Sequence, residues 1–151
     1  MTIAATAAPQ GVDGNVRRLL TPLCGQVRAQ PHAPAVRSGS LSLTYAELSD
    51  SIGQWVAALS ATGVRRDDLV ALTAEREPAT IALILAVLDT GGVCLPLDAG
   101  YPPVRLNAML EDAQPRLLVT SGQSSTAWPA HIRRCSRDEL ATRGLAAGKV
   151  R

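Results

Sequence analysis

Aromatic side chains, long apolar runs and paired cysteines are all scarce in this sequence of 151 residues. Phe is absent and aromatic residues make up 3%, so aliphatic side chains must fill any core. No apolar run reaches the roughly 20 residues that a transmembrane helix needs, and the first residues lack the charged and apolar regions of a signal peptide. The sequence therefore predicts no membrane partner and no secretion.

The cysteines Cys24, Cys94 and Cys135 are odd in number, widely spaced and without a CxxC motif. This pattern argues against a disulfide framework or a zinc site and favours a reducing cytoplasm. The net charge of +2 is too small to indicate nucleic acid as a partner. The basic residues after Trp128 also lack the aromatic platforms that bind single strands. A hydrophobic content of 46% nevertheless predicts a packed core.

The most apolar part of the chain runs from Ala79 to Leu88 and is interrupted only by Thr80. It predicts a helix that is buried on most sides within a larger domain. Gly91 and Gly92 follow, and their permissive backbone predicts the end of this helix. Because such a helix needs a large packing surface, we expect a contiguous apolar patch around it if part of that surface lies outside this chain.

A short strand is expected next. Val93–Leu95 is an apolar run typical of a strand covered on both faces, and Pro96 is expected to end it because proline cannot donate to a ladder. Asp98 then lies at the rim of the sheet. It could bind a ligand, although a turn-initiating aspartate is the commoner role.

Helices and strands alternate along the rest of the chain. Thr44 and Glu47 have the spacing of a capping box at the start of a helix that ends at Gly63. This alternation predicts an α/β fold with a parallel sheet. Helices are expected over 15–30, 45–62, 79–88 and 102–114, and strands over 34–38, 40–44, 69–73, 93–95 and 116–120. By composition, residues 1–13 form a flexible N-terminus, 14–121 the folded domain, and 122–151 a degenerate linker and tail. Residues 138–147 could form one short helix, but their apolar residues form no clear stripe, so we expect the core-forming part of the chain to end near Gly122.

Spacing alone indicates no active site. His32 and His131 are interpreted as loop histidines because neither has the neighbours of a metal site or a catalytic triad. Cys94 is interpreted as a small apolar residue. The pair Gly91-Gly92 follows a helix, whereas a phosphate loop needs its glycines before one.

Two stretches carry a family resemblance. Leu43-Thr-Tyr-Ala-Glu-Leu48 resembles the first core motif of the adenylation domains of nonribosomal peptide synthetases, and Leu88-Asp-Thr-Gly-Gly-Val-Cys-Leu-Pro-Leu-Asp98 resembles the second. The resemblance extends from about Val16 to Ser121. The residues that carry it are Leu43, Thr44, Tyr45, Glu47, Leu48, Leu88, Gly91, Gly92, Pro96 and Asp98, and the resemblance gives them mainly scaffold roles.

The sequence also departs from the family pattern. Asp89 and Thr90 stand where the second motif usually has lysine and alanine, and Val93-Cys94 replaces an alanine-aromatic pair. The segment Gly122–Trp128 lacks the paired glycines and lysine of the family's phosphate loop, and no segment resembles the specificity pocket or the region of the catalytic lysine. We therefore expect no catalytic, cofactor-binding or metal-binding residue in this chain.

The resemblance implies the N-terminal portion of the large subdomain of an adenylate-forming AMP-dependent synthetase, an incomplete set of helices layered on a mostly parallel sheet. The complete domain would use ATP and magnesium to convert a carboxylate into an acyl-adenylate and then transfer it to a carrier-protein thiol. We expect this chain to be a truncated fragment that is inactive alone. The alternative is a non-catalytic binding module that complements the remainder of an adenylation domain or docks on another synthetase subunit.

Overall fold

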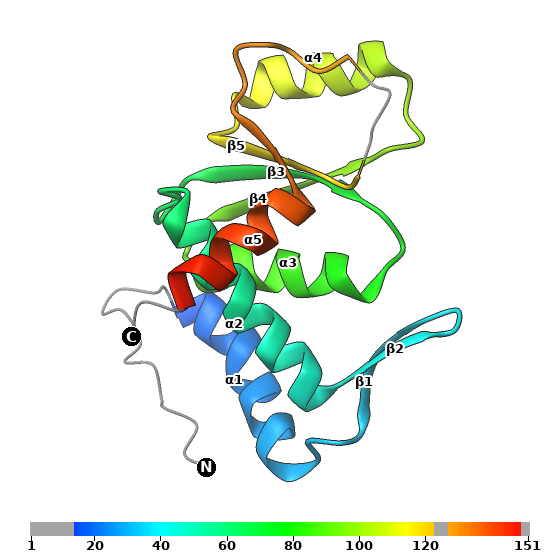
Figure 1. Cartoon of the computed structure of the whole chain (residues 1–151), viewed down its shortest axis with the longest axis vertical. Helices are drawn as coiled ribbons and strands as arrows, with labels where there is room; N and C mark the ends of the chain where they lie inside the picture. Colours follow the sequence, from blue (N-terminus) through cyan, green and yellow to red (C-terminus); the bar gives the residue numbers. More distant parts are fainter. Residues whose placement is uncertain (1–13, 123–126, 149–151) are drawn as a thin grey trace.

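The computed structural model describes residues 14–122 and 127–148, which form a four-stranded sheet, a two-stranded hairpin and five helices (Figure 1). The helices are α1 (Gly14–Ala29), α2 (Tyr45–Ala61), α3 (Pro78–Asp89), α4 (Pro103–Ala113) and α5 (Arg137–Gly148). The strands are β1 (Pro34–Ser38), β2 (Leu41–Thr44), β3 (Leu69–Ala74), β4 (Val93–Asp98), β5 (Leu117–Thr120) and β6 (Arg134–Ser136). The α/β fold is confirmed, whereas the predicted flexible segment 1–13 lies outside the described residues.

The larger sheet has the strand order β4-β3-β5-β6, and every neighbouring pair is parallel. The carboxyl ends of its four strands therefore lie along the same side of the sheet, which we call the carboxyl edge. Figure 1 shows α1, α2, α3 and α5 on one side of the sheet and α4 on the other. The β1–β2 hairpin is antiparallel and lies beside α2, away from the larger sheet.

Aliphatic side chains fill both sides of this sheet, as the composition predicts. Leu59, Leu72 and Leu83 are fully buried in the cluster between the sheet and α2, α3 and α5. Leu106 and Leu110 of α4 are fully buried in a second cluster on the opposite face. None of the helices in the described segments is both long and apolar enough to cross a bilayer.

The predicted boundaries of α2 and α3 are confirmed. Thr44 Oγ1 accepts a hydrogen bond from the Glu47 amide, while Glu47 Oε2 accepts one from the Thr44 amide at 2.8 Å. After α3, Gly91 has φ +79°, the left-handed conformation that glycine adopts without a steric penalty. On α3 itself, Ile81 is 41% exposed but Leu83 is fully buried. The extent of an apolar patch there stays a prediction.

The prediction of a three-residue strand that is covered on both faces is wrong. β4 continues through Pro96 to Asp98, and Val93 is 49% exposed. The reason is that β4 is an edge strand, with β3 as its partner. The Val93 amide donates to the Asp68 carbonyl, next to β3, at 2.9 Å. Because backbone N–H groups alternate in direction along a strand, the nitrogen of Pro96, three residues later, faces away from β3. The missing N–H of Pro96 therefore costs no hydrogen bond to β3.

The expectation that the core ends near Gly122 is also wrong. β6 extends the sheet beside β5, and Cys135 and Leu140 are buried in the same cluster as α2 and α3. α5 packs closely on α2, because a Cβ atom added to Gly144 would lie 2.9 Å from the Gln54 carbonyl oxygen. Residues 134–148, predicted to be linker and tail, therefore complete the fold. The prediction failed because residues 138–147 show no apolar stripe. Where α5 crosses α2 closely, small residues are buried instead of large apolar ones.

Candidate functional site

The candidate site lies where β3, β5 and β6 end. Thr73 is near the carboxyl end of β3, Ser121 directly follows β5, and Arg137 directly follows β6. In open sheets of parallel strands, this edge is where ligands usually bind. The parallel topology therefore brings together residues that are up to 64 positions apart in the chain.

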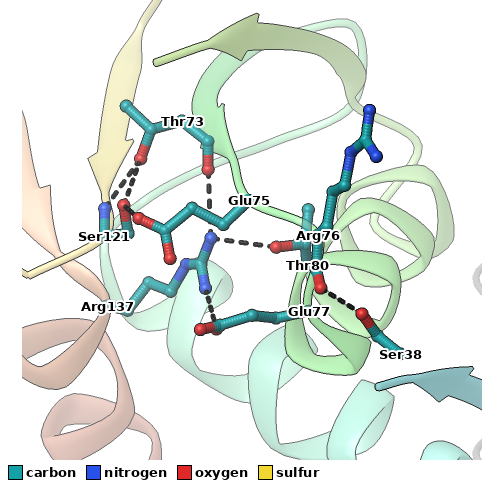
Figure 2. Close-up of polar contacts among 8 residues, drawn as sticks. All are labelled: Ser38, Thr73, Glu75, Arg76, Glu77, Thr80, Ser121 and Arg137. Atoms are coloured by element: carbon teal, nitrogen blue, oxygen red, sulfur yellow. Dashed lines mark hydrogen bonds and ion pairs between the residues drawn. The ribbon is translucent and has the colours of Figure 1, made fainter. Parts of the chain in front are cut away.

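Arg137 is the central residue of this edge (Figure 2). It is 8% exposed, and its guanidinium donates to the Thr73 carbonyl and to Thr80 Oγ1, both at 3.0 Å. It also forms an ion pair with Glu77 at 3.2 Å. These bonds tie the start of α5 to the end of β3 and the start of α3, and they compensate the cost of burying the cation.

A chain of hydroxyl groups lies beside this guanidinium. The Ser121 amide donates to Thr73 Oγ1 at 2.7 Å, the two hydroxyl oxygens are 3.0 Å apart, and Ser121 Oγ also donates to a Glu75 carboxylate oxygen. Figure 2 shows Glu75 directed toward Ser121, across from the guanidinium. The network fixes the ends of β3 and β5 relative to each other.

An open pocket of about 440 Å³ is formed at this edge. Its lining includes three carboxylate residues and one arginine whose charge is already paired with Glu77. The lining residues are Trp55, Glu75, Glu77, Ala79, Ser121, Gly122, Arg137, Asp138 and Ala141. This surplus of negative charge is unfavourable to the phosphate groups of a nucleotide.

The pocket also lacks the elements of nucleophilic catalysis. Ser121 has a carboxylate partner, but the two histidines of the chain are elsewhere: His32 is exposed, and His131 lies 3.4 Å from Glu111. Burial raises the pKa of Cys94 to about 11 and also raises the pKa of Cys135. Burial therefore disfavours the thiolate, the nucleophilic form, of both side chains. Within residues 14–122 and 127–148, no group of His, Cys, Asp or Glu is arranged to hold a metal ion.

The residues that sequence motifs singled out lie away from this pocket and serve the scaffold. Asp98 Oδ1 accepts a hydrogen bond from the Gly100 amide at 2.8 Å, which is the turn role. A Cβ atom on Gly92 would lie 3.1 Å from the Asp68 carbonyl oxygen, so the turn after α3 packs against the start of β3. At the start of α2, Thr44 and Glu47 form the cap and Tyr45 is the first residue of the helix. Leu43 and Leu48 pack in or against the core. Leu88 lies on α3, Gly91 in the turn after α3, and Pro96 in the edge strand β4.

Sequence reasoning missed Arg137 and the carboxylates around it. One local signal was available, because Ser136 and Glu139 have the spacing of a capping box. The structure contains this box: the Ser136 amide donates to Glu139 at 2.8 Å and the Glu139 amide donates to Ser136 Oγ at 3.2 Å. It marks the start of α5 and therefore places Arg137 in the first turn.

Comparisons with known proteins agree with this architecture. A family model described as "AMP-binding enzyme" matches residues 24–149. Tyrocidine synthase 3 of Brevibacillus parabrevis is 36% identical over 115 residues, which cover 76% of this chain and 2% of the synthase.

Two solved structures share the fold. The N-terminal subdomain of Klebsiella oxytoca NpsA aligns with a TM-score of 0.73 and 22% identity, over 80% of this chain and 30% of that one. The artificially fused adenylation–PCP di-domain NpsA-ThdA aligns with a TM-score of 0.74 and 21% identity, over 84% of this chain and 23% of that one. The present chain thus spans less than a third of the length of each of these three proteins.

Proposed function

Because the chain belongs to the AMP-binding enzyme family, we propose that it forms the N-terminal part of an adenylation domain that activates an amino acid for nonribosomal peptide synthesis. The observation that carries this proposal is the 36% identity to tyrocidine synthase 3 over 76% of the chain. In the complete domain, a carboxylate and ATP would give an acyl-adenylate and pyrophosphate. A carrier protein such as the PCP part of the NpsA-ThdA fusion would be the acceptor of the acyl group.

We further propose that the 151 residues do not catalyse this reaction alone. The aligned region is 30% of the NpsA N-terminal subdomain, so most of that fold is supplied by other residues. The carboxylates of Glu75, Glu77 and Asp138, which line the pocket of this chain, would be unfavourable neighbours for phosphate groups. ATP and magnesium would therefore be held by the remainder of the domain, and this chain would supply the packed wall on which that remainder rests.

A second candidate is a non-catalytic module that docks on a separately encoded synthetase subunit. It is favoured by the burial that the chain achieves by itself: both clusters contain fully buried leucines, among them Leu59, Leu72, Leu106 and Leu110. A segment with its own buried core can persist as a separate polypeptide and associate afterwards.

The test is amino-acid-dependent exchange of pyrophosphate into ATP. The chain alone should give no exchange. Co-expression with the segment of tyrocidine synthase 3 that directly follows the 115 matched residues should restore it, while that segment alone should not. Exchange by the isolated chain would overturn the claim of inactivity. A stable complex without exchange would favour the docking module.

A further inference from the structure

The pocket at the carboxyl edge has an apolar part and a charged part, and several elements contribute to each. The apolar part is formed by Trp55 of α2, Ala79 of α3 and Ala141 of α5. The charged part consists of carboxylates that follow β3 or begin α5, together with Arg137. Small-molecule sites are concave, hold roughly 300–1,000 Å³ and combine an apolar wall with a few polar groups. With about 440 Å³, this pocket has the size and the composition of such a site.

Two of the three carboxylates in the lining have no cation as a partner. Glu77 is paired with Arg137, but neither Glu75 nor Asp138 forms an ion pair with another described residue. Asp138 lies in the first turn of α5, where an acid stabilises a helix. Glu75 lies in the loop between β3 and α3, so no helix start accounts for its charge. Because carboxylates outnumber the guanidinium, the pocket favours a cation.

A buried donor of Arg137 indicates a second property of the ligand. The Arg137 side chain is 10% exposed, and within the described part of the chain its Nε is buried without a hydrogen-bond partner. The other two guanidinium nitrogens donate to Glu77, to the Thr73 carbonyl and to Thr80. Figure 2 shows this guanidinium between the side chains of Glu75 and Glu77, both of which line the pocket. A buried N–H without an acceptor costs free energy, so an oxygen atom of a ligand that reached Nε would stabilise the site.

The oxygen that suits this position is a neutral one. A carboxylate of the ligand would be repelled by the carboxylates of the lining, and the charge of Arg137 is already offset by Glu77. A hydroxyl or carbonyl oxygen can accept from Nε without adding charge. An ammonium group of the same ligand would lie against Glu75 and Asp138, where the ring of Trp55 also attracts a cation.

We propose that the carboxyl-edge pocket binds a small organic ammonium ion that carries a neutral oxygen acceptor beside the charged nitrogen and an aliphatic group. An amino amide is a simple compound of this class. Its ammonium group would contact Glu75 and Asp138, its carbonyl oxygen would accept from Arg137 Nε, and its aliphatic group would pack on Trp55. The proposal goes beyond the proposed function, because none of these contacts involves ATP or an adenylate.

The experiment titrates the full chain with L-leucinamide at low salt and about pH 6, where an α-amino group is protonated. NMR follows the indole N–H signals of the two tryptophans. The signal of Trp55 should shift and saturate, whereas that of Trp128, which packs in the cluster with α4, should stay in place. Isoamylamine lacks the oxygen and isocaproamide lacks the charge, so each should bind at least about threefold more weakly than leucinamide.

Two substitutions test the carboxylates without changing their size. Glu75→Gln removes a charge but keeps an oxygen that can accept from Ser121, and Asp138→Asn removes the second charge. Each should weaken leucinamide binding about threefold, and the two together about tenfold. The matched control is Asp112→Asn, because Asp112 is exposed on α4 and its loss should leave the affinity unchanged. Circular dichroism verifies that each variant keeps the fold.

The outcomes separate the parts of the proposal. The absence of a saturable shift of the Trp55 signal would overturn it, and so would equal losses in Glu75→Gln and Asp112→Asn. If isoamylamine bound as tightly as leucinamide, the contact with Arg137 Nε would be wrong. If isocaproamide did so, the pocket would not select a cation. All of these results are independent of the proposed function, because pyrophosphate exchange is measured without any of these compounds.

Discussion

Helices α2 and α5 begin with the same hydrogen-bonded arrangement but bury different kinds of surface. In each, the side chain of a glutamate accepts from the amide of the cap residue at 2.8 Å, and the cap hydroxyl accepts from the glutamate amide. Thr44 and Glu47 form the first box, and Ser136 and Glu139 form the second. The local signal for a helix start is therefore equally strong in both segments.

The buried faces differ. α2 buries large side chains at helical spacing, including Leu48, Ile52 and Leu59. α5 buries Leu140 and then Gly144, whose Cα lies against the backbone of α2. A helix whose neighbour approaches closely needs small residues, and small residues leave little hydrophobic pattern in the sequence. The start of a helix is thus encoded locally, whereas its packing partner is not.

The largest expected effect tests whether α5 belongs to the core as fully as α2 does. Leu140 and Leu59 are both 0% exposed. Leu140→Ala should lower the free energy of unfolding by about 3 kcal/mol, because it removes apolar contacts and leaves a cavity. Leu59→Ala should cost about the same, and urea unfolding followed by circular dichroism measures both. A loss below about 0.5 kcal/mol for Leu140→Ala would show that α5 is dispensable.

A smaller effect is expected where α5 joins the carboxyl edge of the sheet. Arg137→Met keeps much of the side-chain volume but leaves the Thr73 carbonyl and Thr80 without their donor. We expect the free energy of unfolding to fall by about 2 kcal/mol. This is less than is usual for breaking a fully buried ion pair, because the Glu77 side chain is 45% exposed. Arg134→Met is the matched control, since Arg134 is exposed on β6 and the change should be nearly neutral. Equal unfolding midpoints for the two variants would contradict a stabilising role for Arg137.

The sequence was sufficient for the elements whose signals are local. The capping box at Thr44, the apolar helix α3 and its glycine turn at Gly91 follow from residue type and spacing, and the structure contains all three. The carboxyl-edge site could not be predicted in this way, because Thr73 and Arg137 meet only after β6 takes its place in the sheet. Strand order also determines how far β4 is buried. The apolar residues at its start suggested burial on both faces, but β4 lies at the edge of the sheet and Val93 is exposed. Topology was the missing information in both cases.

The two caps provide a direct comparison with a lower expected effect. Thr44→Ala and Ser136→Ala each remove the oxygen that accepts from a helix amide. Each should cost about 1 kcal/mol of unfolding free energy, as is usual for a lost cap. Chemical denaturation of the two variants checks this equality. If Thr44→Ala were costly and Ser136→Ala silent, the box of α5 would be a geometric coincidence rather than a contribution to the fold.

The smallest effects distinguish an acid at the start of a helix from one at the end. Hydrogen bonds from the Thr44 backbone and side chain lower the pKa of Glu47 below its ordinary value of 4.5. Glu47 therefore stabilises the fold at neutral pH, and this contribution is lost as the pH falls through the lowered pKa. At the other end of a helix, burial raises the pKa of Asp89 above its ordinary value of 3.8. Its ionisation is unfavourable in the fold, so a destabilisation develops as the pH rises through the unfolded and then the raised folded pKa.

Replacing these two carboxylates with neutral amides should consequently change the stability of the fold in opposite directions. At pH 7, Glu47→Gln should unfold at a lower urea concentration than wild type, whereas Asp89→Asn should unfold at a higher one, because its charge also opposes the negative end of the α3 dipole. Both differences should shrink as the pH is lowered below the pKa values of the two carboxyl groups, where the groups become protonated. Urea midpoints measured at each pH for the three proteins check both signs. A stabilising effect of Asp89→Asn that persists unchanged in acid would mean that helix propensity, and not charge, separates the two ends.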